Sequence, residues 1–251
     1  MLRVYTSWKM NKTLAEARAY VDGLRAGPRP DPADVDLAIL PAFTALTTVA
    51  AALDGLPIRL GAQNAMWADA GAFTGEVSPA MLADVGCEIV ELGHSERRAL
   101  FGETDATVNA RVHAVLRHGL EPLVCVGETA EERRLGAAVE TVLRQARMAL
   151  AGVSPDDLHR CRFAYEPVWA IGEGGVAASP ATVAEMHAAL KAAFPIVPVL
   201  YGGSVDLANA GTMAALPGVD GLFVGRAALD PARFLAIAAA AQAARSAAVP
   251  R

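Results

Sequence analysis

The chain of 251 residues is 53% hydrophobic, so it can bury one large core without needing disulfides or structural metal ions. Its net charge of −5, with no Lys/Arg run longer than two residues, argues against a nucleic-acid partner. No apolar segment reaches the roughly 20 residues of a membrane span, so the sequence predicts a protein that avoids membranes and acts on a small molecule.

Short apolar runs recur along the chain and predict eight strands. They lie at residues 4–8, 35–40, 58–62, 89–92, 122–126, 162–166, 198–201 and 222–224. Most are apolar throughout rather than alternating, which is typical of strands buried on both faces of a parallel sheet. A helix-like segment follows each of them.

Helix start signals support this alternation. Thr13, with Glu16 three residues later, forms a capping-box pattern and predicts a helix over residues 13–25. Ser179-Pro180 and Asp230-Pro231 are N-cap and first-turn signals for two later helices. Eight strand-then-helix units predict a closed (β/α)8 barrel, built as one domain over residues 1–251.

An open, doubly wound sheet is the alternative to a barrel. Such a sheet usually carries a GxGxxG turn after its first strand, whereas this strand runs into Lys9-Met10-Asn11. The three cysteines, Cys87, Cys125 and Cys161, are odd in number and lack a CxxC or Cys/His ligand spacing. They indicate reduced thiols and a cytoplasmic protein.

Polar residues follow most of the predicted strands, at the end of the barrel where active sites of this architecture lie. They are Lys9, Asn64, His94-Ser95-Glu96, Glu128, Glu166, Ser204 and Gly225-Arg226. Lys9, His94 and Glu166 follow three different strands. Together they provide a cation, a proton-transfer group and a base.

Each of these residues has a structural alternative when it is taken alone. His94 suits a hydrogen-bonded structural histidine, Glu166 a capping or salt-bridged carboxylate, and Lys9 a solvated charge. Gly202-Gly203 suits a plain turn.

Two further carboxylates, Glu103 and Glu128, are expected in buried ion pairs with Lys9 or with the arginines Arg97 and Arg98. Glu96 with Arg97 also suits an ordinary ion pair. None of these pairs has a catalytic role in this interpretation.

Seven short motifs follow one another through nearly the whole chain. They are Trp8-Lys9-Met10-Asn11, Ala62-Gln63-Asn64, Thr74-Gly75-Glu76, the segment 91–98, Cys125-Val126-Gly127-Glu128, the segment 164–172 and Tyr201-Gly202-Gly203-Ser204-Val205. In this order they resemble the triosephosphate isomerase family. The resemblance implies a (β/α)8 barrel that isomerises a short phosphorylated sugar through an enediol(ate).

The same resemblance implies a role for each polar residue at the mouth. Glu166 would move a proton between two adjacent carbons, neutral His94 would polarise the carbonyl and move protons between the oxygens, and Lys9 would supply positive charge. These roles come from the family and not from the spacing. Ser95, Glu96 and Asn64 would support the site.

A loop that closes over the site is expected after Glu166, because a carboxylate removes a proton from carbon efficiently only where water is excluded. The predicted lid comprises Pro167, Val168, Trp169, Ala170, Ile171, Gly172, Glu173 and Gly174. Pro167 stiffens its start, while Gly172 and Gly174 permit a hinge. Backbone N–H groups at Gly172, Ser204, Gly202-Gly203 and Gly225 would hold the phosphate.

The pattern departs from the commonest one of the family at three places. Ser7 stands where the family usually has Asn, Glu173-Gly174-Gly175 replaces Thr-Gly-Lys, and Arg226 replaces a second glycine. Ser7 would leave room beside the substrate, and Arg226 adds a phosphate-binding cation or bulk. With Trp67, these residues resemble a bacterial branch of the family that includes isomerases of erythrulose phosphates.

Three functions follow as expectations. The first is conversion of glyceraldehyde 3-phosphate to dihydroxyacetone phosphate, in glycolysis and gluconeogenesis. The second is isomerisation of a tetrulose phosphate in tetritol breakdown. The third, a barrel that binds a phosphorylated metabolite without turnover, is disfavoured by the joint presence of Lys9, His94 and Glu166.

The resemblance also implies a homodimer, in which a loop containing Thr74, Gly75 and Glu76 inserts into the partner near its Lys and His. A tetramer is an alternative. No metal ion and no organic cofactor is implied, because enolisation beside a carbonyl needs only a base, an electrophile and exclusion of water.

Overall fold

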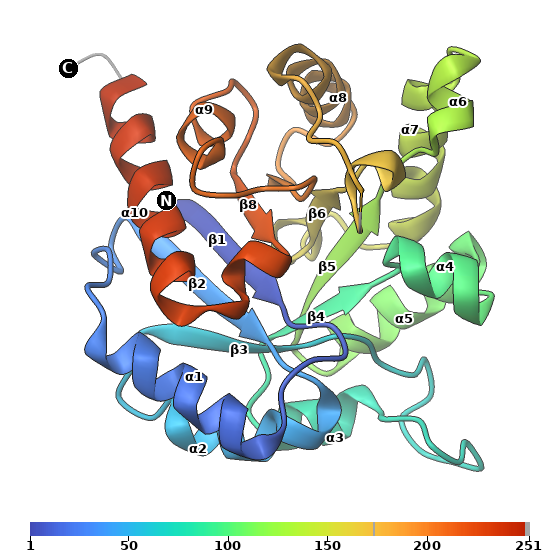
Figure 1. Cartoon of the computed structure of the whole chain (residues 1–251). Helices are drawn as coiled ribbons and strands as arrows, with labels where there is room; N and C mark the ends of the chain where they lie inside the picture. Colours follow the sequence, from blue (N-terminus) through green and yellow to red (C-terminus); the bar gives the residue numbers. More distant parts are fainter. Residues whose placement is uncertain (173, 249–251) are drawn as a thin grey trace.

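Eight parallel strands close into a barrel in the computed structural model of the chain, which describes residues 1–172 and 174–248 (Figure 1). The strands are β1 (Leu2–Ser7), β2 (Val35–Leu40), β3 (Ile58–Ala62), β4 (Ile89–Leu92), β5 (Glu121–Val126), β6 (Arg162–Tyr165), β7 (Val199–Tyr201) and β8 (Gly221–Val224). Each strand pairs with its neighbour in the sequence, and β8 pairs with β1, with Gly221 opposite Arg3. The predicted (β/α)8 barrel is therefore confirmed.

The helices surround the barrel (Figure 1). The α-helices are α1 (Leu14–Ala26), α2 (Leu46–Ala52), α3 (Pro79–Asp84), α4 (Ser95–Phe101), α5 (Asp105–Arg117), α6 (Ala130–Arg134), α7 (Ala138–Ala149), α8 (Pro180–Ala193), α9 (Ala210–Ala214) and α10 (Pro231–Ala248). Short 3-10 helices are η1 (Phe43–Ala45), η2 (Leu158–Arg160), η3 (Val168–Ala170) and η4 (Arg226–Leu229). In the part of the chain that the structure describes, none of the helices combines the length and the apolar character that crossing a membrane requires.

The helix starts follow the local signals in the sequence. Thr13 caps α1 with its side chain, and the Glu16 side chain bonds back to the Thr13 N–H, which completes the capping box. Ser179 caps α8 directly before Pro180. The Asp230 carboxylate accepts a hydrogen bond of 2.8 Å from the Arg233 N–H at the start of α10.

The interior of the barrel is layered because successive residues of a strand point alternately inward and outward. An apolar layer at mid-height consists of Tyr5, Ala38, Leu40, Ile89, Leu123, Cys125, Ala164, Leu200 and Phe223. At the amino-terminal end of the strands, Arg59 pairs with Asp36, Glu88 and Glu121 and closes the floor with charge. Ser7, Glu91 and Glu166 each lie two residues beyond a member of the apolar layer, so they point inward at the opposite, carboxyl-terminal end.

The strand ends differ slightly from the prediction. β1 begins at Leu2 and ends at Ser7, and β6 ends at Tyr165, so Trp8 and Glu166 lie just beyond the strands. The physical reason at β1 is the turn at Lys9, whose φ of 53° no strand accommodates. All three cysteines are buried and free, as expected for reduced core thiols.

Candidate active site

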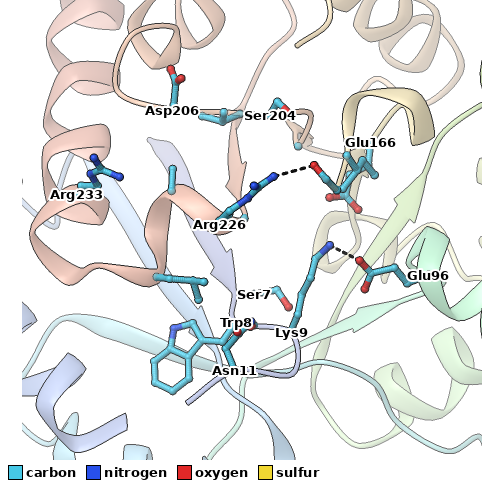
Figure 2. A pocket seen from close by; sticks show the side chains of 17 residues that line it. Ser7, Trp8, Lys9, Asn11, Glu96, Glu166, Ser204, Asp206, Arg226 and Arg233 are labelled. Carbon is cyan, nitrogen blue, oxygen red and sulfur yellow. Dashed lines mark hydrogen bonds and ion pairs between the residues drawn. The ribbon is translucent and has the colours of Figure 1, made fainter. Parts of the chain in front are cut away.

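A cavity of about 670 Å³ opens at the carboxyl-terminal ends of the strands (Figure 2). Its lining includes the sequence-predicted residues Ser7, Lys9, Glu96, Glu166, Gly172, Gly202, Ser204, Gly225 and Arg226. Figure 2 shows Lys9 and Glu96 paired on one side and Arg226 reaching across from the end of β8. Polar residues that are far apart in the sequence therefore line one cavity.

Glu166 is held at the bottom of this cavity by its backbone. Its N–H donates to the Val126 carbonyl at 2.8 Å, which ties it to the end of β5. The side chain is buried, and Oε2 has no hydrogen-bond partner among the described residues. A Cβ at Gly202 would lie 2.8 Å from Glu166 Cγ, so the glycine provides the room that this carboxylate occupies. Burial, reinforced by the neighbouring Glu91 carboxyl, raises the pKa of Glu166 to about 8, which makes it a stronger base than an exposed glutamate.

His94 lies opposite this carboxylate and is neutral. Its Nε2 is 3.6 Å from Glu166 Oε2, and its Nδ1 accepts a hydrogen bond of 3.1 Å from the Glu96 N–H at the start of α4. Because Nδ1 is an acceptor, the imidazole hydrogen belongs on Nε2, which faces Glu166. Burial, with the positive charge of Lys9, lowers the pKa of His94 to about 4. His94 can therefore donate a hydrogen bond without carrying a charge.

Lys9 turns into the cavity through an unusual backbone conformation. Its φ is 53°, and its Nζ bonds to Glu96 Oε1 at 2.5 Å. Lys12 and Ser204, which also lie beyond the ends of strands, share this left-handed conformation with φ of 76° and 49°. Such conformations are costly for residues other than glycine and persist where the surrounding structure enforces them.

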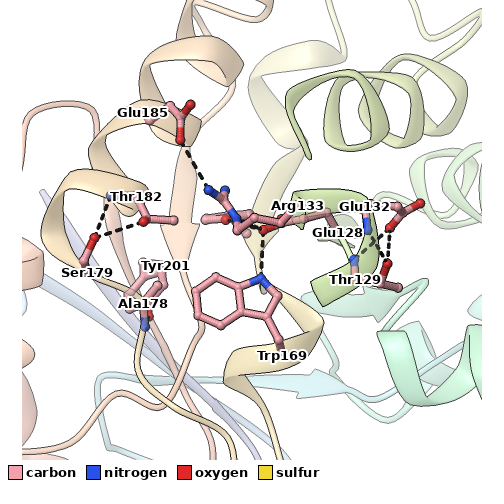
Figure 3. Close-up of polar contacts among 11 residues, drawn as sticks. Glu128, Thr129, Glu132, Arg133, Trp169, Ala178, Ser179, Thr182, Glu185 and Tyr201 are labelled. Carbon is pink, nitrogen blue, oxygen red and sulfur yellow. Dashed lines mark hydrogen bonds and ion pairs between the residues drawn. The ribbon is translucent and has the colours of Figure 1, made fainter. Parts of the chain in front are cut away.

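The first part of the predicted lid is anchored through Trp169 (Figure 3). Glu128 Oε1 accepts hydrogen bonds from Trp169 Nε1 at 3.0 Å, Arg133 Nε at 2.7 Å and the Tyr165 hydroxyl at 3.3 Å. The Val168 N–H also donates to the Glu128 carbonyl at 2.9 Å. Glu128 thus pairs with Arg133, and its expected partners Lys9, Arg97 and Arg98 were wrong, because the curvature of the barrel brings α6 and not β1 or α4 beside it.

The middle of the lid contacts the loops after β7 and β8. The Ser204 hydroxyl donates to the Ala170 carbonyl at 2.6 Å, and Arg226 Nη2 donates to the Gly172 carbonyl at 2.8 Å. At the far end, the Ala178 N–H donates to the Tyr201 hydroxyl at 3.2 Å (Figure 3). Gly172 and Gly174 have φ of 83° and 82°, a left-handed conformation that glycine adopts without strain. Glu173 lies outside the described residues.

The predicted phosphate groups divide into two sets. Within residues 1–172 and 174–248, the N–H groups of Gly172, Ser204 and Gly225 donate to no protein acceptor, so they are open to an anion. The Gly202 N–H instead donates to the Tyr165 carbonyl at 2.9 Å, so this donor is already engaged, although Gly202 lines the cavity. Gly203 packs against the Tyr201 ring and does not line the cavity.

The supporting residues lie at different distances from the cavity. Glu96 lines it, whereas Ser95 opens α4 on the far side of Glu166, beside a second cavity of about 310 Å³. Asn64 is buried behind the site, where its amide donates to Glu103 Oε1 at 3.4 Å. Glu103 pairs with Arg97, as expected, and also with Arg111, which the sequence did not indicate.

The structure adds residues that the sequence interpretation missed. Asn11, Asp206 and Arg233 line the cavity. Glu91 lies buried beneath it, in contact with Cys125. The signal for Glu91 was present, since it is a lone carboxylate in an otherwise apolar strand at the inward-facing position.

Three buried side chains could offer ligand atoms to a metal ion. Glu91, His94 and Glu166 each offer one atom, and these atoms lie within 4.8 Å of one another. The hydrogen bond that Nδ1 accepts, however, assigns the imidazole hydrogen to the Nε2 that faces Glu166, which leaves this nitrogen no lone pair to give to a metal. The donor set therefore suits proton transfer better than metal binding.

The loop that contains Thr74, Gly75 and Glu76 does not line this cavity. It projects from the barrel between β3 and α3 (Figure 1), and all three residues are exposed. Trp67 and Phe73 stack edge to face at its base, with ring centroids 6.5 Å apart.

Comparisons with known proteins give a consistent family. The family model described as triosephosphate isomerase matches residues 2–241. A protein of Brucella abortus biovar 1 (strain 9-941) named L-erythrulose-1-phosphate isomerase is 48% identical over 240 residues, 93% of this chain and 94% of the relative. One of the same name from Mycolicibacterium smegmatis is 49% identical over 235 residues, 90% and 88% of the two chains. A protein of Chloroflexus aurantiacus named triosephosphate isomerase is 47% identical over 240 residues, 92% and 95% of the two chains.

Proposed function

The chain belongs to the triosephosphate isomerase family, and we propose from this that it isomerises L-erythrulose 1-phosphate by proton transfer between adjacent carbons. The observation that carries the chemistry is Glu166 Oε2, which has no hydrogen-bond partner in the described part of the chain and faces the protonated Nε2 of neutral His94. Glyceraldehyde 3-phosphate, the first expectation from the sequence alone, is the second candidate substrate. It is supported by the relative named triosephosphate isomerase.

The two candidates differ by one group. L-erythrulose 1-phosphate is dihydroxyacetone phosphate with a hydroxymethyl group on the hydroxylated carbon beside the carbonyl, at the end away from the phosphate. That carbon is the one that loses its proton. A site for the tetrulose therefore needs extra room near the base, whereas the phosphate end stays the same.

Ser7 supports the larger substrate. It lines the cavity beside Lys9 and below Glu166, and its short side chain leaves space where a longer one would project. Arg226 supports either substrate, because its guanidinium lies at the lid end of the cavity, near the open N–H groups of Gly172, Ser204 and Gly225.

In the proposed reaction, Glu166 takes the proton from C3 while the C2 carbonyl oxygen accepts hydrogen bonds from His94 Nε2–H and Lys9 Nζ. The electron pair of the broken C–H bond forms the C2–C3 double bond, and negative charge moves to the C2 oxygen. His94 then transfers a proton between the two oxygens, and Glu166 returns a proton to C2. The carbonyl has moved to C3, and no oxidant or cofactor takes part.

The test is kcat/KM of purified protein for L-erythrulose 1-phosphate and for glyceraldehyde 3-phosphate, with Ser7→Asn as a paired variant. We expect wild type to prefer the tetrulose. Ser7→Asn should lower kcat/KM for the tetrulose about tenfold or more and change kcat/KM for the triose much less. The reason is that the longer side chain would fill space that only the larger substrate needs.

Two other outcomes would contradict the proposed substrate. A wild-type preference for the triose that Ser7→Asn leaves unchanged would replace the tetrulose by the second candidate. Turnover of neither sugar, combined with binding of inorganic phosphate, would favour a barrel that binds a phosphorylated metabolite without chemistry.

We also propose a homodimer, formed around the loop that contains Thr74. Met10, Leu100 and Phe101 are 97%, 74% and 67% exposed, an unusual display of large apolar side chains. Their segments lie near the start of the connection from β3 to this loop, because the Gln63 amide bonds to the Lys9 carbonyl and Asn64 bonds to Glu103 just beyond α4. Light scattering should give twice the chain mass for wild type and a smaller mass for Thr74→Arg. A monomeric wild type would contradict the proposal, and four chain masses would indicate a tetramer.

A further inference from the structure

Glu91 is a buried carboxyl that the proposed reaction does not use. It is the third residue of β4 and is only 3% exposed. Strand alternation points it into the barrel, in the same layer as Ser7 and Glu166. Its carboxylate lies within 4.8 Å of the ligand-type atoms of His94 and Glu166, so it forms the floor under this pair.

The partners of Glu91 are polar but uncharged. The Cys125 thiol lies 3.8 Å from Glu91 Oε1, and the Ser7 hydroxyl lies beside the carboxyl. Among the ion pairs of the described residues, none involves Glu91. A buried carboxylate without a directly bonded cation is costly to ionise. Burial accordingly raises the pKa of Glu91 to about 7.

The charge of Glu91 acts on Glu166 directly through space. Cys125 lies beside both inward-facing acids. The titratable or charged groups around the pair are Lys9 beyond β1, His94 and Glu96 beyond β4, Cys125 of β5, and Arg98 near that cysteine. After burial, the Glu91 charge is the largest influence that raises the pKa of Glu166. Two acids in this arrangement titrate as a coupled pair.

We propose that Glu91 is a positioning residue of the isomerase site, whose carboxyl beneath the His94–Glu166 pair strengthens Glu166 as the base. The proposal rests on the proposed function. A proton bonded to carbon is hard to remove. A base of higher proton affinity therefore lowers the barrier to its removal, as long as the base is ionised. Glu91 adds negative charge on the side of Glu166 that faces away from the substrate, and there it does not obstruct binding.

The first test is the pH dependence of kcat/KM. In wild type, activity should fall as the pH drops below the pKa of Glu166, near 8, because the base must be ionised. Glu91→Gln keeps the shape and removes the negative charge, so the acid limb should move about 1 pH unit lower. The plateau of kcat should also fall several-fold, since the base is weaker. Glu91→Asp retains a carboxyl and should restore most of the shift.

The matched control is Glu88→Gln, which removes one negative charge directly before β4. Glu88 is exposed and bonds to Arg59 at the opposite end of the barrel. Its pH profile should superimpose on that of wild type. An acid limb that stays in place in Glu91→Gln, or moves equally in Glu88→Gln, would overturn the proposal.

A second measurement needs no turnover. The carboxyl carbon of Glu166, identified by its loss in Glu166→Gln, can be titrated by ¹³C NMR in the full-length protein. Its midpoint should move to lower pH in Glu91→Gln and not in Glu88→Gln. If wild type isomerises neither sugar, the proposed function fails while this titration still decides the coupling. If it isomerises one and the midpoint stays in place, only the role of Glu91 fails.

Discussion

We expect Glu166→Gln to lower kcat by about 10³-fold while KM changes little. Glutamine has the shape of glutamate but cannot accept the proton, and a positioned general base contributes roughly 10²–10⁴-fold to a rate. The groups proposed to bind phosphate at Gly172, Ser204 and Gly225 are not altered. Binding of inorganic phosphate, measured by calorimetry, should therefore remain close to wild type. Unchanged turnover would remove Glu166 from the mechanism.

The control for this variant is Glu185→Gln, which removes an exposed carboxylate of α8 that lies 3.5 Å from Arg133. It should retain full activity.

Measuring the free energy of unfolding distinguishes a loss of catalysis from a loss of folding. Because folding raises the pKa of Glu166 from 4.5 to about 8, wild type loses stability as the pH rises through this interval. Glu166→Gln lacks this loss, so its free energy of unfolding relative to wild type should be higher at pH 9 than at pH 5.

Gly127→Ala should reduce both stability and activity. A Cβ at this position would lie 1.9 Å from the Glu166 carbonyl oxygen and 2.6 Å from its carbonyl carbon, so backbone must move. The Gly127 segment cannot yield freely, because the Gln145 side chain bonds to both its N–H, at 2.8 Å, and its carbonyl, at 3.1 Å. We expect the free energy of unfolding in urea to fall by about 3 kcal/mol. The kcat/KM should fall about 10²-fold, since a displacement of order 1 Å misplaces the base.

Gly211→Ala is the comparison for this substitution. Gly211 lies in α9, and the atom nearest to the methyl group of the new alanine would be Ala244 Cβ at 3.2 Å, a side chain that needs to yield only slightly. Alanine also favours the helix by about 1 kcal/mol. The free energy of unfolding should therefore change by less than about 1 kcal/mol. Equal behaviour of the two variants would show that the contact at Gly127 is relieved without cost.

The high pKa values of Glu91 and Glu166 imply that ionising these two buried carboxyls lowers the free energy of unfolding. Two acids are buried in one layer of the barrel, and no cation is bonded to either of them among the described residues. This arrangement destabilises the folded protein. An apolar pair of similar volume would be more stable. The arrangement makes sense where base strength matters more than the last increment of stability.

Much of this molecule could be predicted from local sequence. The eight strands were visible as apolar runs, because a strand buried on both faces must be apolar throughout. The start of α1 was visible because the Thr13–Glu16 capping box depends on neighbours three residues apart. The convergence of Lys9, His94 and Glu166 followed once the strands were placed, since the carboxyl ends of parallel strands share one end of the barrel.

Closure of the barrel alone decided which side chains meet across it. Glu91 meets Glu166, Arg133 and Trp169 share Glu128, and Arg226 reaches the Gly172 carbonyl across 54 residues of chain. No local pattern encodes these contacts, because they depend on strand tilt, on register and on which neighbours lack a side chain, as Gly202 does beside Glu166. The sequence by itself determined the barrel and indicated Glu166 as the proposed base. The tertiary structure decided the proton affinity of Glu166, because burial and a second carboxyl act on it through space.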